Sequence, residues 1–364
     1  MSNRRNFIKQ MVTAGIVSSI PSTFSIAGNK TSSALLTKQN KPKDIIWANL
    51  LHLSFNMWHD STPLELRDEN YEWKTSDEAY KWALGYRPFL TFDEPSWNTL
   101  LQEMADVGVN MVVIDLGDAV QYESHLEIAV RDAWTIDKLR SELAKMRKMG
   151  LEPIPKLNFS AIHDVWLGDY ARKVSTKEYY EVCSDLISEV IEIFNYPRFF
   201  HLGMDEEGFE LPGRDFVVVR KNHIWWGDLY FFISQVEKKG VRPWIWADYG
   251  WDHPEEFYNK MPKSVVQSNW YYGASFDFNK LSDRSKTMVG FYQDLQTHGY
   301  DQIPTGSNHS NDINFESTTE YCKKVIDPSN LLGFMQTPWR PTLALCMDRH
   351  QKAVEQLGRA IRKY

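Results

Sequence analysis

The densest run of chemically active side chains is the acidic triplet Asp205-Glu206-Glu207, which directly follows the apolar segment 198–204. Adjacent carboxylates are costly to bury, because desolvation and a neighbouring like charge both raise a carboxyl pKa. Carboxyl groups in such settings act as general acids, general bases or nucleophiles. The structural alternative is an acidic helix start, where the macrodipole favours negative charge. The triplet is therefore either a catalytic centre or the first turn of a helix.

Aromatic residues gather at comparable places later in the chain. They make up 14% of the sequence, with 14 Trp, 17 Tyr and 19 Phe. Those at or just after the ends of apolar segments are Trp246, Trp270, Tyr271, Tyr272 and Trp339. A carboxylate cleft with aromatic walls is typical of sugar sites, since rings stack on apolar C–H faces while polar groups bind hydroxyls. This combination predicts a carbohydrate ligand.

The elements that must position these side chains follow an alternating pattern from residue 45 onward. The expected strands are 45–55, 109–116, 151–159, 198–204, 241–248, 264–270, 300–306 and 331–339. The expected helices are 95–108, 135–150, 175–194, 226–240, 284–299, 317–326 and 343–364. Apolar strands that alternate with amphipathic helices predict a parallel sheet covered by helices. Eight repeats favour a single-domain α/β fold, the (β/α)₈ TIM barrel, over an open sheet.

A barrel of this kind carries its chemistry at the carboxyl ends of the strands, where the triplet and the aromatic residues lie. Glycoside hydrolysis usually needs two carboxyl groups on opposite sides of the scissile bond. Asp205 and Glu206 suit this poorly, because successive residues of a strand point to opposite faces. Substrate-assisted hydrolysis needs only one protein acid, since the 2-acetamido oxygen of the sugar is the nucleophile.

The residues around the triplet carry a family resemblance. HLGMDEE (201–207) resembles the H-x-G-x-D-E signature of the family-20 glycoside hydrolases, the β-N-acetylhexosaminidases. Four further segments are similar to family-20 motifs in the same order along the barrel: NFSAIH (158–163), WIWAD (244–248), SNWYYG (268–273) and GFMQTPW (333–339). The resemblance extends over most of the chain from about residue 45 to 345.

The resemblance implies a role for each matching residue. Glu206 would be the general acid/base, with Glu207 as the other candidate, and Asp205 would orient the acetamido group. Tyr271 would hydrogen-bond the acetamido oxygen, or Tyr272 if the register shifts by one residue. The remaining residues that would line or support the sugar pocket are Asn158, His163, Trp246, Asp248, Trp270, Tyr272 and Trp339. No metal or cofactor is implied.

The chain also departs from the family pattern. The family's first-strand arginine has no counterpart in LLHLSFNMWHD (50–60), and Gly273 stands where an acidic residue usually follows the W-Y pair. Two alternatives therefore stay open. The first is a glycosidase for a non-acetamido sugar, with Asp248, Asp115 or Asp118 as nucleophile. The second is a barrel that binds carbohydrate without cleaving it.

Two long connections are expected to border the cleft. The stretch 59–94 is longer than an ordinary loop and is predicted to form a lid or a wall over the barrel mouth, with a packed extension as the alternative. The connection 208–225 could bring Arg214, Arg220 or His223 to the cleft. The polar segment SNHSND (307–312) is read simply as a loop.

The amino terminus resembles an export signal. Arg4-Arg5 precede an apolar stretch from residue 11 to 20, which is typical of a twin-arginine signal peptide and too short for a stable membrane anchor. We expect a signal over residues 1–27, a polar linker over 28–43 and the catalytic domain over 44–364. A periplasmic or secreted protein, without stable membrane insertion after cleavage, is the expected product.

Composition excludes several other classes of protein. The formal charge of −7, from 41 basic and 48 acidic residues, argues against a nucleic-acid partner, which needs a basic face. Cys183, Cys322 and Cys346 are far apart and predict buried thiols rather than disulfides. The ten histidines show no metal-ligand spacing, so no metal site is expected. The sequence leaves the oligomeric state open.

Overall fold

The computed structural model describes residues 45–61, 73–207 and 213–364. The predicted signal peptide (1–27) and linker (28–43) lie outside the described residues, as do parts of the two long connections, 62–72 and 208–212. Among the described residues, none of the helices combines the length and apolar character that a bilayer span requires.

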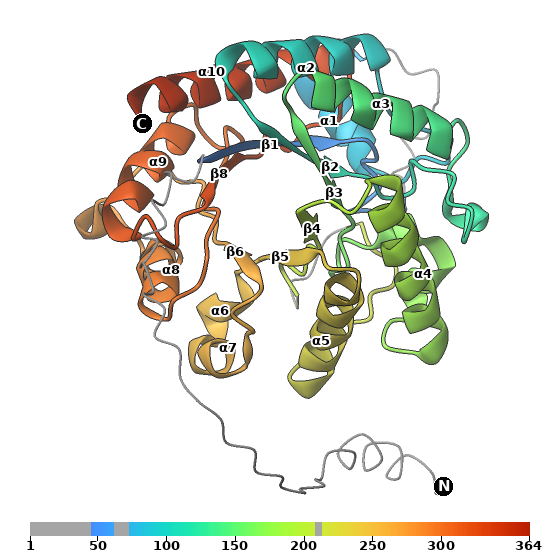
Figure 1. Ribbon diagram of the computed structural model, residues 1–364. Helices are drawn as coiled ribbons and strands as arrows, with labels where there is room; N and C mark the ends of the chain where they lie inside the picture. Colours follow the sequence, from blue (N-terminus) through green and yellow to red (C-terminus); the bar gives the residue numbers. More distant parts are fainter. Residues whose placement is uncertain (1–44, 62–72, 208–212) are drawn as a thin grey trace, which may run out of the picture. The chain divides into compact units, whose positions relative to one another are not determined.

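Eight parallel strands form a barrel surrounded by helices (Figure 1). The strands are β1 (Ile46–His52), β2 (Met111–Asp115), β3 (Glu152–Lys156), β4 (Phe199–His201), β5 (Arg242–Trp246), β6 (Val266–Ser268), β7 (Thr305–Gly306) and β8 (Gly333–Gln336). They pair in the order β6-β5-β4-β3-β2-β1-β8-β7. Isolated parallel bridges, Trp270 to Thr305 and Gln267 to Gln302, connect the two ends of this order. The predicted (β/α)₈ barrel is confirmed.

All seven predicted helices are present, and three shorter ones were missed. The helices are α1 (Ser76–Leu84), α2 (Glu94–Val107), α3 (Ile136–Lys148), α4 (Lys177–Ile193), α5 (His223–Lys238), α6 (Tyr249–Asp252), α7 (Pro254–Lys260), α8 (Asp283–Thr297), α9 (Asn314–Val325) and α10 (Met347–Lys363). Among the residues that the structure describes, short 3-10 helices occupy Leu126–Ile128, Val165–Arg172, Phe278–Lys280 and Ala344–Cys346. The missed α1, α6 and α7 have at most nine residues each, which is too short for a clear helical period.

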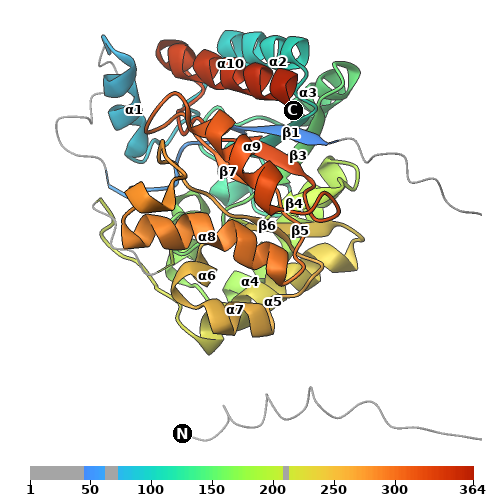
Figure 2. The same cartoon turned by 90° about the vertical axis from the view of Figure 1, so that its left-hand side faces the viewer.

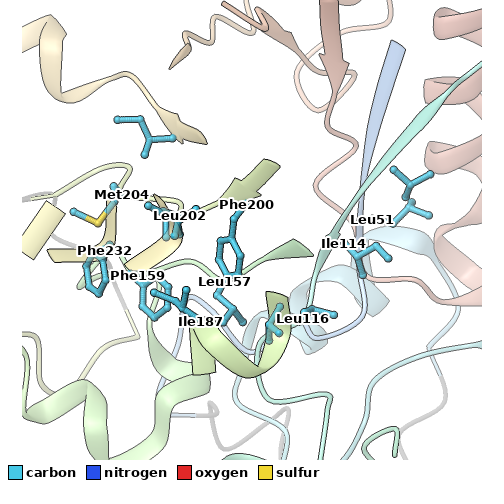
Figure 3. Packing of buried hydrophobic residues seen from close by; sticks show 14 of the residues in the cluster. Leu51, Ile114, Leu116, Leu157, Phe159, Ile187, Phe200, Leu202, Met204 and Phe232 are labelled. Atoms are coloured by element: carbon cyan, nitrogen blue, oxygen red, sulfur yellow. The ribbon is translucent and has the colours of Figure 1, made fainter. Parts of the chain in front are cut away.

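The strands are apolar along both faces because each face packs on something different. Inward residues such as Leu50, Val113 and Ile154 fill the barrel interior. Outward residues pack against the helices, as Figure 3 shows where Phe159 and Met204 lie near Phe232 of α5. The Phe159 and Phe232 rings stack with centroids 4.6 Å apart. Burial on both sides explains why the sequence shows continuous apolar runs rather than strict alternation.

The inward positions turn polar near the carboxyl ends of the strands. His52, Asp115, Lys156 and His201 are paired side by side across β1 to β4 and are almost fully buried. The Lys156 ammonium contacts the Asp115 carboxylate, whose other neighbour is His52 Nδ1 at 3.6 Å. Burial raises the pKa of Asp115, and Lys156 offsets only part of that rise. This layer of polar and charged side chains fills the barrel interior near the carboxyl ends of β1 to β4.

Candidate active site

A pocket of about 280 Å³ opens at the carboxyl end of the barrel. Its walls come from the connections that follow most of the strands and from α1. The lining residues are Met57, Trp58, Tyr80, His163, Asp205, Glu206, Trp246, Trp270, Tyr272, His309 and Trp339. The acidic triplet and the aromatic strand ends therefore meet in one cavity, at the end of the barrel where the sequence predicted them.

Both Asp205 and Glu206 face this pocket, although alternation along a strand predicted opposite directions. The chain leaves β4 through left-handed conformations at Gly203 (φ +72°), Met204 (φ +71°) and Glu206 (φ +56°), so strand geometry has already ended. A Cβ on Gly203 would lie 1.9 Å from Asn158 Oδ1, which only glycine avoids. Left-handed backbone at non-glycine residues is costly and clusters at functional sites.

Asp205 is held in place by residues of the segment that follows β3. Asn158 Nδ2 donates a hydrogen bond to Asp205 Oδ1 at 2.9 Å, and Ser160 Oγ donates to the Asp205 backbone carbonyl at 2.5 Å. Asn158 is fully buried and does not line the pocket. The expectation that Asn158 contacts the sugar is therefore corrected, because its amide is occupied in orienting Asp205.

Glu206 is paired with His163, which comes from the segment after β3. His163 Nε2 lies 3.0 Å from Glu206 Oε2 and 3.5 Å from Asp205 Oδ2. Burial alone would lower the pKa of His163, but the charges of Asp205 and Glu206 outweigh burial and raise it. Burial would likewise raise the pKa of Glu206, but its hydrogen bond to His163 and the charge there lower it. The pair thus holds one proton between an imidazole and a carboxylate.

Asp248 lies behind the pocket rather than in it. Its Oδ2 accepts the Glu206 backbone N–H at 2.7 Å, and its Oδ1 accepts Trp270 Nε1–H at 3.3 Å. Burial and the nearby Asp205 raise the pKa of Asp248 to about 8. A carboxyl group that is neutral at pH 7 and does not reach the cavity is a poor nucleophile. It fits the orienting role that the resemblance implied.

Glu207 faces away from the pocket. Its carboxylate contacts the Arg220 guanidinium and accepts the Ala161 backbone N–H at 3.0 Å. Arg220 also pairs with Asp228 at 3.0 Å, and all three charged side chains are almost completely buried. Of the two adjacent glutamates, only Glu206 reaches the cavity.

The basic residues of the connection 208–225 do not reach the cleft, so that prediction is wrong. Arg220 is taken up by the ion pairs just described, and Arg214 pairs with Asp164 at 2.9 Å. His223 begins α5 and is exposed. Both arginines lie in buried ion pairs, where they neutralise carboxylates beside the pocket.

Tyr272, rather than Tyr271, faces the pocket. Trp270 and Tyr272 are two residues apart and their rings stack, with centroids 5.0 Å apart. The Tyr271 ring points to the other side, 5.2 Å from Phe276 within the outer core. The assignment to Tyr271 is therefore corrected, because side chains in extended backbone alternate and Trp270 already faces inward. Burial raises the pKa of Tyr272, so its phenol stays protonated and can donate a hydrogen bond.

The three tryptophans that were predicted for the sugar pocket come from the ends of β5, β6 and β8. Trp246, Trp270 and Trp339 all line the pocket, with the Trp246 and Trp339 rings 6.0 Å apart. Trp339 Nε1 donates to the Tyr272 hydroxyl at 3.0 Å, and Trp339 has a left-handed backbone (φ +48°). These rings form an apolar wall facing the carboxylates.

Four lining residues were not among the predicted site residues: Met57, Trp58, Tyr80 and His309. Met57 and Trp58 follow β1, and His309 follows β7 within the segment that was read only as a loop. Their position after barrel strands was the available signal. Nothing local in the sequence of these segments indicates that the side chains turn inward.

The stretch 59–94 is largely a packed extension in its described part. Trp73 and Trp82 pack with ring centroids 4.5 Å apart, and the Arg87 guanidinium lies 3.8 Å from the centroid of the Trp82 ring. Tyr80 of α1 is its described contribution to the pocket wall. Residues 62–72 of the predicted lid lie outside the described residues.

The other carboxylates considered as nucleophiles do not line the cavity. Asp115 is paired with Lys156 inside the barrel. Asp118 accepts hydrogen bonds from Ser54 Oγ at 2.6 Å and Asn56 Nδ2 at 2.8 Å, and burial raises its pKa to about 7. Within the part of the chain that the structure describes, Asp205 and Glu206 are the two carboxylates that line the pocket.

His163, Asp205 and Glu206 are also the residues whose geometry could hold a cation. One ligand atom from each lies within 4.8 Å of the others. A metal needs an imidazole nitrogen free of its proton. The raised pKa of His163 instead favours a proton on Nε2, facing the two carboxylates.

The fold and the pocket together define a (β/α)₈ barrel with a pocket lined by a carboxylate pair and aromatic rings. No protein-family model and no curated protein matches this chain in sequence. Solved structures match it in fold. A family-20 β-N-acetylglucosaminidase superposes with a TM-score of 0.52 at 11% identity, over 87% of this chain and 70% of that protein.

Two further solved structures are also similar to this chain in fold. The family-20 β-N-acetylhexosaminidase of Streptomyces coelicolor A3(2) has a TM-score of 0.54 at 11% identity, over 86% of this chain. Our chain spans only 64% of that enzyme's length. Dispersin B has a TM-score of 0.53 at 15% identity, over 75% of this chain and 95% of its own. The resemblance seen in the sequence motifs is thus matched by a divergent family-20-like barrel fold.

Proposed function

We propose that this protein is a glycoside hydrolase that releases a β-linked 2-acetamido sugar with retention, by substrate-assisted catalysis. The observation that carries the proposal is the pair of adjacent carboxylates, Asp205 and Glu206, which face one cavity that Tyr272 also lines. Because Asp205 and Glu206 are adjacent in the chain, they do not flank the glycosidic bond from two sides. The nucleophile must then come from somewhere other than the protein. The 2-acetamido oxygen supplies that nucleophile.

In the first step, the acetamido oxygen attacks the anomeric carbon while the proton held between His163 and Glu206 passes through the Glu206 carboxyl group to the departing glycosidic oxygen. One C–O bond forms as the other breaks, and the product is a cyclic oxazolinium with positive charge on its nitrogen. The Asp205 carboxylate stabilises that charge, because a preorganised group in a dry site acts strongly on developing charge. Tyr272 donates to the attacking oxygen and holds it in line.

In the second step, Glu206 accepts a proton from water as that water attacks the anomeric carbon. The oxazolinium opens, the acetamido group is restored, and the two inversions leave the anomeric configuration unchanged. His163 serves both steps as the partner of Glu206. The single proton that the two groups share can be delivered to the leaving group and recovered from water.

The walls supply binding and exclude water. Trp246, Trp270 and Trp339 offer apolar faces to the sugar ring, and a dry pocket strengthens the interaction of Asp205 with the cationic intermediate. The neutral state of Asp248 at pH 7 supports its role as an orienting group for the Glu206 backbone rather than a nucleophile. These features favour the acetamido substrate over the alternative that needs a second catalytic carboxylate.

We also propose that the protein acts outside the cytoplasm. The support is the Arg4-Arg5 pair and the apolar stretch that follows it. Cell fractionation of the full-length chain and of an Arg4→Lys, Arg5→Lys variant tests this. Export of the variant at the wild-type level would contradict a twin-arginine route.

The activity is tested with a panel of chromogenic β-glycosides, with and without an acetamido group. We expect turnover of N-acetylglucosaminide or N-acetylgalactosaminide, inhibition by a thiazoline analogue of the oxazolinium, and loss of turnover in Glu206→Gln. The matched control is Glu237→Gln, the same change at an exposed position of α5. Turnover of non-acetamido sugars only would overturn the mechanism, and binding without any turnover would overturn the enzymatic function.

A further inference from the structure

A second cavity adjoins the candidate active site. It has a volume of about 480 Å³ and shares His309 with the first pocket. Its polar wall includes Asp77, His309, Asn311, Asp312, Arg340 and Arg349. These residues come from α1, from the connections after β7 and β8, and from the start of α10. Figure 2 shows α1 beside the start of α10, where Cys346 Sγ contacts the Ser76 carbonyl at 3.8 Å.

The two cavities are separated by a thin, shared wall. Tyr80 lines the first cavity, and its ring lies 6.4 Å from that of His309. The Arg340 guanidinium, which lines the second cavity, stacks 4.2 Å from the centroid of the Tyr80 ring. Asn311 Nδ2 donates to the Tyr272 backbone carbonyl at 2.8 Å. The two cavities are therefore neighbours, with Tyr80 and His309 between them.

The strand order shows on which side of the cleaved bond the second cavity lies. Glu206 follows β4, and β8 lies four strands from β4 in the ring of eight, on the opposite side of the barrel. Because Glu206 protonates the glycosidic oxygen, the leaving group lies on the β4 side. The end of the sugar that carries its outer hydroxyls then points toward β7, β8 and α1. The second cavity lies on that side.

The chemistry of the second cavity suits a neutral, hydroxyl-rich ligand. Arg349 pairs with Asp312 at 3.0 Å, and Arg340 approaches Asp77 at 3.7 Å. Asp348 adds a third carboxylate, so the wall carries one negative charge in excess. Each pair keeps further N–H donors and carboxylate lone pairs for hydroxyl groups. Burial and the two arginines lower the pKa of His309, so its imidazole stays neutral. An anionic ligand would meet no surplus of positive charge here.

The catalytic pocket itself lacks charged groups for the outer hydroxyls. Where the first strand ends, Met57 and Trp58 form the wall. Among the described lining residues, the only charged groups are Asp205, Glu206 and His163, at the other end of the sugar. A second sugar attached to an outer hydroxyl would therefore not displace a charged side chain that binds this hydroxyl.

We propose that the second cavity is a subsite for a second sugar unit, attached on the non-reducing side of the one that is cleaved. This rests on the proposed function, and it extends the substrate from a single terminal sugar to an oligosaccharide from which a disaccharide is released. The polar wall binds the hydroxyls of the additional unit, and the Tyr80–His309 wall lies beside the linkage.

The test compares two nitrophenyl glycosides, the N-acetyl-β-glucosaminide and the chitobioside, with initial products separated by chromatography. We expect the chitobioside to yield nitrophenol and intact disaccharide, with a kcat/KM about tenfold higher than that of the monosaccharide glycoside, a gain equal to about one hydrogen bond to a charged group. If only the terminal monosaccharide is released from the chitobioside, the second subsite is overturned and the proposed function stands. If neither glycoside is cleaved, both proposals are overturned.

A variant assigns the effect to this cavity. In Arg349→Ala, we expect the chitobioside-to-monosaccharide ratio of kcat/KM to fall about tenfold. The control is Arg359→Ala, the same change further along α10, where the arginine pairs with Glu316 and lies outside both cavities. Thermal unfolding verifies that both variants fold. An unchanged ratio in folded Arg349→Ala would overturn the assignment of the subsite to this cavity.

Discussion

Glu206 and Glu207 are adjacent in sequence, but one side chain faces the pocket and the other is buried in an ion pair. The Glu206 carboxylate reaches the cavity and shares a proton with His163, whereas Glu207 neutralises the buried Arg220. The sequence could not separate the two, because the left-handed turn at Glu206 depends on the close approach of Gly203 to Asn158. That approach is made by the neighbouring strand and leaves no local signal.

Changing each glutamate to glutamine should therefore affect different properties, activity for Glu206 and stability for Glu207. Glu206→Gln should lower kcat/KM at least a hundredfold, the usual scale for a general acid, with little change in unfolding free energy. Glu207→Gln should cost about 3 kcal/mol of unfolding free energy, because it leaves Arg220 incompletely compensated in a buried site. Urea unfolding and steady-state kinetics measure both. A stable but inactive Glu207→Gln would reverse the assignment.

The two adjacent tyrosines give a second contrast. Tyr272→Phe removes the hydroxyl that faces the pocket and should lower kcat/KM about a hundredfold, as for the loss of one oxyanion donor. Tyr271→Phe changes a ring in the outer core and should leave kcat/KM near the wild-type value. The register that separates them was available from Trp270, since residues two apart share a face. Equal losses in the two variants would contradict the placement.

The pKa of His163 gives a pH dependence with a definite sign. Its pKa is raised in the folded state, so its contribution to stability is fully present below the unfolded value of about 6.5 and is lost as pH rises through the folded value. We expect kcat/KM to fall over the same interval, because Glu206 loses the partner that holds its proton. In His163→Gln, unfolding free energy should become flatter with pH in that window. An unaltered pH profile would argue against the shared proton.

At the scale of elements, the exit from β4 decides whether the site forms. The alternation of strands and helices was readable from the sequence because both faces of each strand are buried. The short helices α1, α6 and α7 were not, and α1 contributes Tyr80 to the pocket wall. His309 was missed for a related reason, since it enters the pocket through an irregular connection without any periodic pattern.

Gly203 and Gly240 form a matched pair for testing the β4 exit. Both have left-handed backbones, with φ of +72° and +73°, but a Cβ on Gly203 meets Asn158 whereas one on Gly240 meets nothing within 4 Å. Gly240→Ala should cost about 1 kcal/mol of unfolding free energy for backbone strain alone. Gly203→Ala should cost more and should also lower kcat/KM, because Asn158 orients Asp205. Equal effects at the two positions would mean that the contact is unimportant.

At the scale of the whole molecule, the barrel brings together residues that are up to 282 positions apart, from Met57 to Trp339. Eight alternations predicted the ring, and the position of each polar group at a strand end predicted which side of the ring carries the chemistry. The second cavity was not predictable, because its wall combines α1, the connections after β7 and β8, and the start of α10. No local pattern specifies that junction.

The central claim is that the sugar supplies its own nucleophile, and fluorination of its acetamido group tests this most directly. Each fluorine withdraws electrons from the acetamido oxygen and weakens its attack on the anomeric carbon. Across nitrophenyl glycosides with N-acetyl, N-difluoroacetyl and N-trifluoroacetyl groups, we expect kcat/KM to fall steeply with each added fluorine. A kcat/KM that is independent of fluorination would contradict substrate assistance and would require a nucleophile from the protein.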